Sequence, residues 1–284
     1  MSERASIAPI VRFSRGESST DQDLVAAESP LEVWLDQLGT GRRESIGLVM
    51  RTPGDDRELV TGLLISEQIV TAPDDLVDVV FVWPDADAPA GTSARPQQAR
   101  VTLAAHVDLD AVQATRALDR TSACGMCGRL ALQSVEVSGG RAPDTPRLDP
   151  DVITRIPDRL RDAQAVFSET GGLHAAALCD LTGAPWLVRE DVGRHNAVDK
   201  VIGAAFAAGR LPARDQVLAV SGRIAYEIVQ KAAVAGVAAI VAVGAPTSLA
   251  VEAARAVGLT LAGFTRGDRF NVYTGAGRVR RAGE

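Results

Sequence analysis

The second half of the chain alternates short apolar stretches with amphipathic ones, and this alternation limits the fold more than any other feature. The apolar stretches have the length and composition of buried strands, and the amphipathic ones have helical spacing. Strands that alternate with helices are typical of an α/β domain built on a parallel or mixed sheet. The predicted strands are 186–188, 217–220, 239–243 and 259–264, and the predicted helices are 196–208, 224–235 and 247–257.

The first half predicts a smaller region that mixes strands with one helix. Residues 55–70 carry Leu59, Val60, Leu63 and Leu64 on one face, which favours a helix. Around it, strand-like patterns occupy residues 31–38, 45–51, 77–83 and 100–105. We therefore expect a strand-rich α+β region over 1–120, a C-x-x-C loop and linker over 121–150, and an α/β domain over 151–284 that can also draw in part of the N-terminal region.

Composition and charge fit a soluble globular protein. Hydrophobic residues make up 46% of the 284 residues and charged residues 23%. The net charge of −6 argues against nonspecific nucleic-acid binding. No apolar run approaches the roughly 20 residues of a membrane span, and no N-terminal segment has the pattern of a signal peptide. We expect a cytoplasmic protein with neither a membrane nor a nucleic acid as partner.

Two of the three cysteines, Cys124 and Cys127, form a C-x-x-C motif flanked by glycines and followed by Arg129. A structural disulfide is disfavoured in a reducing cytoplasm, so metal binding, redox chemistry and sulfur transfer remain. Backbone N–H groups or a cation such as Arg129 can lower a cysteine pKa from about 8.5 to roughly 3.5–7.5. The motif therefore favours a nucleophilic, sulfur-carrying cysteine.

Two alternatives for the cysteines stay open. A structural zinc site needs four ligands, but the remaining candidates form no second close pair. A thioredoxin-like dithiol follows a strand, whereas residues 109–118 ahead of the motif have helical spacing. The remaining zinc-ligand candidates are Cys179, His106, His174 and His195.

A polar stretch over residues 189–200, REDVGRHNAVDK, lies between a predicted strand and a predicted helix. Glu190, Asp191 and Asn196 suit the edge of a heterocycle, and Arg194 and Lys200 suit phosphate. Loops on rigid α/β scaffolds often carry function. This stretch predicts a ligand site, with a solvated helix cap as the alternative.

Two further stretches suit anions. Residues 220–224, VSGRI, pass from a strand through a glycine into a helix, a turn that offers N–H groups to an anion; a simple N-cap at Ser221 is the alternative. Residues 264–275, FTRGDRFNVYTG, place Arg266 and Arg269 around a Gly-Asp turn beside an aromatic residue. The arginines suit pyrophosphate and the aromatic ring suits a base, although an ordinary hairpin would also explain the pattern.

Residues 169–179 place two glycines before small residues that we expect to form a helix. His174 in this stretch is either a ligand-site residue or a satisfied core histidine. A zinc deaminase would carry a glutamate two positions after the histidine, where this chain has Ala176. The stretch therefore lacks the general acid/base of that chemistry.

The motifs together resemble FdhD, the family of formate dehydrogenase accessory sulfurtransferases. SACGMCGR, TGGLHAAAL, REDVGRHNAVDK, SGR, GAPTSLAVEAA and GFTRGDRFNVYTG occur in the family's order within residues 31–275. The resemblance implies a three-layer α/β/α sandwich resembling the cytidine-deaminase fold, without its zinc chemistry. It also implies that a cysteine desulfurase supplies sulfur as a cysteine persulfide. The sulfur passes to the molybdenum or tungsten centre of bis-molybdopterin guanine dinucleotide, which formate dehydrogenase requires.

Carried onto this sequence, the resemblance implies that Cys124 carries the persulfide and that Cys127 assists its transfer. Ala123 and Met126 depart from the serine and leucine common in the family, without removing a reactive group. The implied partners are the desulfurase and the formate dehydrogenase apoprotein, with a possible homodimer and no intrinsic metal. The residues expected to bind the cofactor are Phe264, Thr265, Arg266, Gly267, Asp268, Arg269, Asp191, Arg194, His195, Asn196, Ser221 and Arg223.

Two other functions compete with this one. An insertion chaperone would bind the same cofactor without carrying sulfur, and it would tolerate the loss of both cysteines. A zinc-dependent deaminase would contain stoichiometric zinc.

Overall fold

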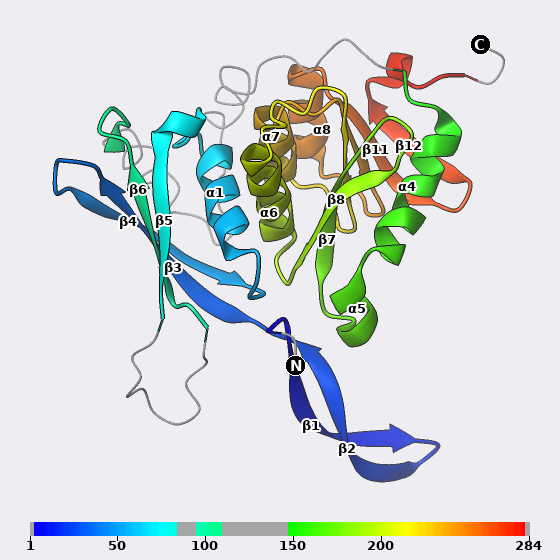
Figure 1. The fold of residues 1–284 in the computed structure, drawn as a ribbon. Helices are drawn as coiled ribbons and strands as arrows, with labels where there is room; N and C mark the ends of the chain where they lie inside the picture. Colours follow the sequence, from blue (N-terminus) through cyan, green and yellow to red (C-terminus); the bar gives the residue numbers. More distant parts are fainter. Residues whose placement is uncertain (1–2, 84–94, 110–146, 282–284) are drawn as a thin grey trace.

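The computed structural model describes residues 3–83, 95–109 and 147–281. Within these ranges the chain forms a six-stranded sheet, a four-stranded sheet and a two-stranded hairpin (Figure 1). The six-stranded sheet belongs to the second half of the chain and has the order β12-β11-β10-β9-β7-β8. Its strands are β7 (His174–Cys179), β8 (Pro185–Asp191), β9 (Val217–Val220), β10 (Ala239–Ala242), β11 (Thr260–Arg266) and β12 (Arg269–Thr274).

The directions of these strands bring several loops to one edge of the sheet. Strands β9, β10 and β11 are parallel, whereas β7 runs antiparallel to both β8 and β9, and β12 runs antiparallel to β11. The last residues of β8 to β11 therefore lie at the same edge as the first residues of β7 and β12. In open α/β sheets, ligands bind outside the carboxyl ends of the strands. The mixed sheet predicted from the sequence is confirmed.

Helices cover both faces of this sheet (Figure 1). One face packs against α6 (Arg194–Ala207), α7 (Tyr226–Val234) and α8 (Ser248–Ala256), and the other packs against α4 (Pro150–Asp162). Successive side chains of a strand point to opposite faces. Thus Ala176 of β7 joins the core under α6 to α8, whereas Ala175 joins the core under α4. The short helix α5 (Ala165–Thr170) follows α4.

The first half of the chain forms the four-stranded sheet, with the order β4-β3-β6-β5. The helix α1 (Asp56–Ser66) packs against it through Val60 and Leu64. The hairpin of β1 (Ala5–Ser14) and β2 (Glu17–Ala26) projects from the rest of the molecule (Figure 1). The remaining elements are β3 (Ser29–Gln37), β4 (Arg43–Arg51), β5 (Leu76–Val82), β6 (Gln98–Leu103) and the 3₁₀ turns Pro73–Asp75 and Ala276–Arg278.

Helices α1 and α6 join the two halves through direct backbone contact. A Cβ added to Gly62 of α1 would stand 1.8 Å from the carbonyl oxygen of Asp199, and one added to Gly203 of α6 would stand 1.9 Å from that of Glu58. Both distances are far below van der Waals contact, so only glycine fits at either position. The buried side chains around these helices form one apolar core that includes both sheets.

Most of the predicted elements are confirmed, with boundaries that move by a few residues. The helix expected within residues 169–179 is wrong, because Ala175–Cys179 are buried on both faces of the sheet as strand β7. Burial between two helical layers overrides the helix propensity of alanine. The hairpin of β1 and β2 and the helix α4 were not predicted.

Some expectations are untested. The helix expected before the C-x-x-C motif and the loop expected over residues 121–150 fall mainly outside the described residues. The division into domains and the likeness to the cytidine-deaminase fold stay predictions. Among the described residues, no helix combines the length and apolar composition needed to cross a bilayer.

The glycine contact generates a first prediction. Gly62→Ala and Gly203→Ala should each lower the free energy of unfolding by about 3 kcal/mol, because an added methyl group forces the two helix backbones apart. Urea unfolding followed by circular dichroism measures this change. Gly277→Ala is the matched control, since its added Cβ meets no atom within 4 Å. Equal stability of the three variants would contradict the backbone contact.

Candidate functional site

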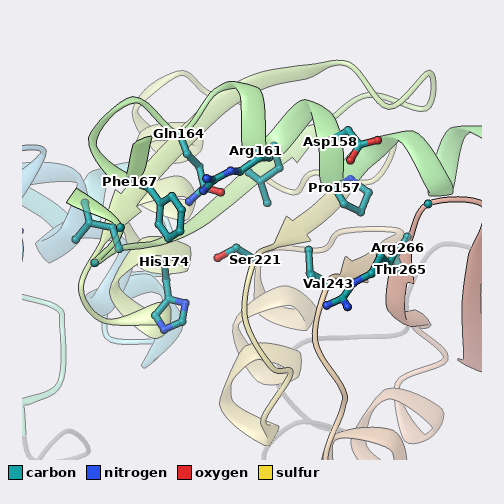
Figure 2. Close-up of a pocket in the computed structure, with 15 residues that line it drawn as sticks. Pro157, Asp158, Arg161, Gln164, Phe167, His174, Ser221, Val243, Thr265 and Arg266 are labelled. Atoms are coloured by element: carbon teal, nitrogen blue, oxygen red, sulfur yellow. The ribbon is translucent and has the colours of Figure 1, made fainter. Parts of the chain in front are cut away.

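A pocket of about 530 Å³ opens at the edge of the sheet where the strand ends meet (Figure 2). Figure 2 shows Gln164 and Phe167 on one side of it and Thr265 and Arg266 on the other, with Ser221 between them. A second pocket of about 460 Å³ shares Val243 and Arg266 with the first, and its other lining residues are Phe264, Arg269 and Asn271. The two pockets therefore adjoin at Arg266.

Phe264 has a strained backbone that directs its side chain outward. Its φ of 53° lies in the left-handed region, which bulky residues rarely adopt. The pairing of β11 with β12 is irregular between Gly263 and Arg266. As a result Phe264 is 52% exposed, although Gly263 and Thr265 on either side are buried. Such strain costs roughly 1–2 kcal/mol and is often found at functional sites.

Arg266 and Arg269 lie opposite each other across a two-residue turn of Gly267 and Asp268. Gly267 has a φ of 58°, the left-handed conformation that glycine adopts at little cost in such turns. Both arginines are exposed, and neither guanidinium bonds to a residue in the described ranges. Two guanidinium groups beside an exposed aromatic ring can bind phosphate and stack on a planar ring.

Ser221 and His174 meet where β9 ends and β7 begins. Ser221 Oγ accepts a hydrogen bond from the backbone N–H of Ala175 at 2.9 Å. The N-cap alternative for Ser221 is wrong, since α7 begins at Tyr226 after its cap, Ala225. His174 is half-buried and lines the first pocket.

The charge state of His174 follows from its surroundings. Burial lowers the pKa of His174, electrostatic interactions with Arg194 and His195 lower it further, and Asp191 opposes them. The imidazole is therefore neutral at neutral pH, and it can donate one hydrogen bond and accept another. Arg223, expected to bind the cofactor, is exposed in the loop between β9 and α7.

The side chains of the 189–200 stretch mostly bind other parts of this chain. The buried Asp191 carboxylate accepts hydrogen bonds from the backbone N–H of Thr52 at 3.0 Å and that of Gly193 at 2.8 Å, and it pairs with Lys200 at 2.8 Å. Lys200 is 1% exposed and donates to the Thr52 carbonyl at 2.9 Å. The prediction that Lys200 holds phosphate is wrong, because its ammonium group is enclosed and paired.

Asn196 and Glu190 are also engaged. Asn196 donates to the carbonyl of Met50 at 2.8 Å and to Asp191 at 2.9 Å. Glu190 is buried and accepts from the backbone N–H groups of Val166 and Phe167 at 3.0 and 2.8 Å, at the start of α5. These side chains hold β8 against β4 and α5, so the stretch supports the site's walls.

Arg194 and His195 remain as the members of this stretch with room for a ligand. Both are partly exposed, and the buried atoms Arg194 Nε and His195 Nε2 have no hydrogen-bond partner among the described residues. The closest carboxylate oxygen to His195 Nε2 is that of Glu227, at 3.5 Å.

Sequence reasoning missed the wall formed by α4 and α5. Arg161, Gln164 and Phe167 line the first pocket, and the Arg161 guanidinium lies 4.0 Å from the centroid of the Phe167 ring. No motif marks these residues. The spacing of Ile153, Ile156 and Leu160 in α4 was the available signal, because it places them on one buried face.

Cys124 and Cys127 lie outside the described residues, so their roles stay predictions. Cys179 is buried in β7 at 1% exposure, and burial together with Asp180 raises the pKa of its thiol to about 12. The described residues contain no group of three His, Cys, Asp or Glu side chains placed to hold a metal ion. The zinc alternative therefore depends on residues outside the described ranges.

Known proteins resemble this chain over nearly its whole length. A model of the FdhD/NarQ family matches residues 26–280. The chain belongs to the FdhD/NarQ family. The family assignment confirms the resemblance found in the motifs.

Two relatives illustrate the similarity. The sulfur carrier protein FdhD of Streptomyces avermitilis is 43% identical over 273 residues, covering 95% of this chain and 94% of that protein. The protein of the same name from Mycobacterium bovis is 45% identical over 269 residues, covering 94% and 95%. A solved structure from Desulfotalea psychrophila, described as a formate dehydrogenase accessory protein, matches with a TM-score of 0.72 at 21% identity, covering 97% of this chain and 99% of that one. That likeness shows the fold.

The strain at Phe264 generates a second prediction. Phe264→Gly should raise the free energy of unfolding by roughly 1 kcal/mol, because glycine adopts the left-handed conformation without the steric cost. Phe270→Gly is the control: this residue has no left-handed backbone and packs against the core under α4, so its loss should destabilise the protein. Urea unfolding of both variants measures the difference. A loss of stability in Phe264→Gly as large as in Phe270→Gly would contradict the strain.

The raised pKa of Cys179 generates a third prediction. Between pH 7 and 9 the buried thiol stays protonated, and the thiolate is the form that alkylating agents attack. Iodoacetamide should therefore leave Cys179 unmodified in the folded protein and modify it after denaturation in urea. Peptide mass spectrometry at both stages measures this. Modification of Cys179 in the folded state at the rate of a model thiol would overturn its assignment as a buried core residue.

Proposed function

We propose that this protein carries sulfur, as a cysteine persulfide, to the bis-molybdopterin guanine dinucleotide that formate dehydrogenase requires. The observation that carries the proposal is a pair of guanidinium groups, Arg266 and Arg269, which lie in register beside the exposed ring of Phe264 and have no partner in the described part of the chain. This arrangement suits a ligand that combines phosphates with planar rings. The relatives named as sulfur carrier proteins supply the second support.

The substrate is large, and the two pockets are suited to its size. They share Val243 and Arg266, so one ligand can extend from the first to the second. Arg266 stands where the pockets join, and Arg269 lines the second. Phosphates bound at these arginines would leave room for a ring in the more apolar first pocket, lined by Leu160, Leu173 and Val243.

In the proposed mechanism, sulfur moves through two thiol–persulfide exchange steps, one at Cys124 and one at Cys127. The Cys124 thiolate attacks the terminal sulfur of the persulfide on the desulfurase, whose own cysteine leaves as a thiolate. The Cys127 thiolate then attacks Sγ of the Cys124 persulfide, forming a Cys124–Cys127 disulfide and releasing hydrosulfide for the metal centre of the substrate. A thiol reductant of the cytoplasm restores both cysteines.

The proposal includes two protein partners. The desulfurase must reach Cys124, and the formate dehydrogenase apoprotein receives the sulfurated substrate. The cytoplasm is the compartment that suits this chemistry, because free thiols persist there. The protein could also act as a homodimer.

A chaperone that inserts the same cofactor without carrying sulfur is the second candidate. Arg266 and Arg269 favour it as much as they favour the carrier, because they recognise the ligand in both cases. The cysteines separate the two functions, since a chaperone does not need them. A zinc-dependent deaminase is separated from both by metal analysis, because it requires stoichiometric zinc.

The carrier role generates a fourth prediction. Incubation with a cysteine desulfurase and cysteine should add one sulfur atom to the Cys124 peptide, as measured by mass spectrometry. Cys124→Ala should lose this sulfur and abolish activation of formate dehydrogenase in a strain that lacks its own accessory protein. Cys127→Ala should still acquire the sulfur atom on Cys124 but should no longer release it.

Cys179→Ala is the matched control, because Cys179 is buried far from solvent and should not take part. It should keep both the added sulfur and the activation of formate dehydrogenase. Full activation by Cys124→Ala, combined with lost activation by Arg266→Ala, would instead establish the chaperone. Circular dichroism of each variant separates loss of chemistry from loss of fold.

A further inference from the structure

The first pocket has an unsatisfied polar group in each of two opposite walls. Gln164 is 4% exposed and Thr265 is 0% exposed. Gln164 Nε2 and Thr265 Oγ1 have no hydrogen-bond partner among the described residues. Figure 2 shows the two residues on opposite sides of the pocket. Nearly all buried polar groups in proteins are hydrogen-bonded, so two orphans facing one pocket indicate that a polar ligand completes it.

The wall that carries Gln164 is held in place by other residues. Gln164 lies in the turn between α4 and α5, and its carbonyl accepts from Ser168 Oγ at 2.8 Å. Glu190 fixes the next turn by accepting from the backbone N–H groups of Val166 and Phe167. The terminal torsion of glutamine is broad. The side-chain amide can therefore turn toward a ligand while the backbone of the wall stays fixed.

The surroundings of Gln164 suit a flat ring. The Phe167 side chain lines the same wall, with the Arg161 guanidinium 4.0 Å from its ring centroid. Leu160, Leu173 and Val243 add apolar surface. A planar ring can stack here, and its polar edge would meet a primary amide that donates through Nε2. The matching group on the ring is a carbonyl oxygen.

We propose that Gln164 is a specificity-determining residue that recognises a ring carbonyl of the bound substrate in this pocket, with Thr265 completing the contact from the opposite wall. The inference rests on the proposed function, whose substrate contains such a carbonyl in two kinds of ring. Guanine and pterin rings both carry a carbonyl beside a ring N–H, whereas adenine carries an amino group at that position. The phosphates of the same ligand lie toward Arg266 and Arg269 in the adjoining pocket.

Isothermal titration of the full-length protein with GDP, ADP and 6-hydroxymethylpterin tests this assignment. GDP should bind at least about tenfold more tightly than ADP, because the adenine amino group meets the amide donor. Gln164→Glu replaces that donor with an acceptor of the same shape. It should weaken GDP binding by about tenfold or more and leave ADP binding equal or stronger.

Gln22→Glu on the exposed β2 strand is the matched control and should change neither affinity. The pterin distinguishes the two sources of the carbonyl. If it competes with GDP in the natural protein and loses this competition in Gln164→Glu, the pocket takes the pterin end. If only GDP binding depends on Gln164, the pocket takes the guanine end.

Equal binding of GDP and ADP to the natural protein would overturn the role of Gln164, as would unchanged GDP binding by Gln164→Glu. Arg266→Ala separates this failure from a failure of the proposed function. If Arg266→Ala weakens the binding of both nucleotides while Gln164→Glu changes neither affinity, the phosphate site is supported and the recognition of the ring by Gln164 is refuted. Absence of binding by all three ligands would overturn the inference, whereas sulfur on the Cys124 peptide would still support the carrier.

Discussion

The contact between the two halves of the chain determines the rest of the structure. Two of its main elements are the glycine-mediated approach of α1 and α6 and the buried ion pair of Asp191 and Lys200. The pair also binds both backbone groups of Thr52, at the end of β4. Removing one partner of a buried ion pair typically costs about 3–5 kcal/mol, since the other charge is left enclosed. The N-terminal region is therefore locked to the strand end that supports the site.

The same strand end explains the position of the pockets. Asp191 ends β8 and orders the turn into α6 through Gly193 and Asn196, which leaves Arg194 and His195 near His174. One residue earlier, Glu190 fixes the start of α5 on the other face of the sheet. The adjacent carboxylates of Glu190 and Asp191 thus fix the backbone on opposite faces of the sheet at this edge. A substitution at either one would disturb the pockets without removing a side chain that lines them.

Much of the fold could be predicted from the sequence, because the spacing of apolar residues shows which face of a helix or strand is buried. Helices such as α8 have an apolar face that matches their surroundings, whereas β9 and β10 are short runs of mostly branched apolar residues that the structure buries at every position. Strand β7 could not be predicted in this way, because its run of alanines favours a helix and only burial between two helical layers makes it a strand. The β1–β2 hairpin was missed for a different reason: its residues are largely exposed, so their pattern reflects no burial against a core.

The candidate site was predictable only where a local pattern carries chemistry. The turn of Arg266, Gly267, Asp268 and Arg269 combines charges with a glycine at close spacing, and the structure places it beside a pocket. In the 189–200 stretch, the same kind of polar density instead serves contacts with residues about 140 positions away in sequence. Sequence spacing cannot distinguish a carboxylate that is free to bind a ligand from one that accepts hydrogen bonds from backbone groups far away in the sequence. Gln164 presents the opposite case, because no motif marks it. Only the structure shows that it lines a pocket built from separate strands and helices and that its buried Nε2 has no partner among the described residues.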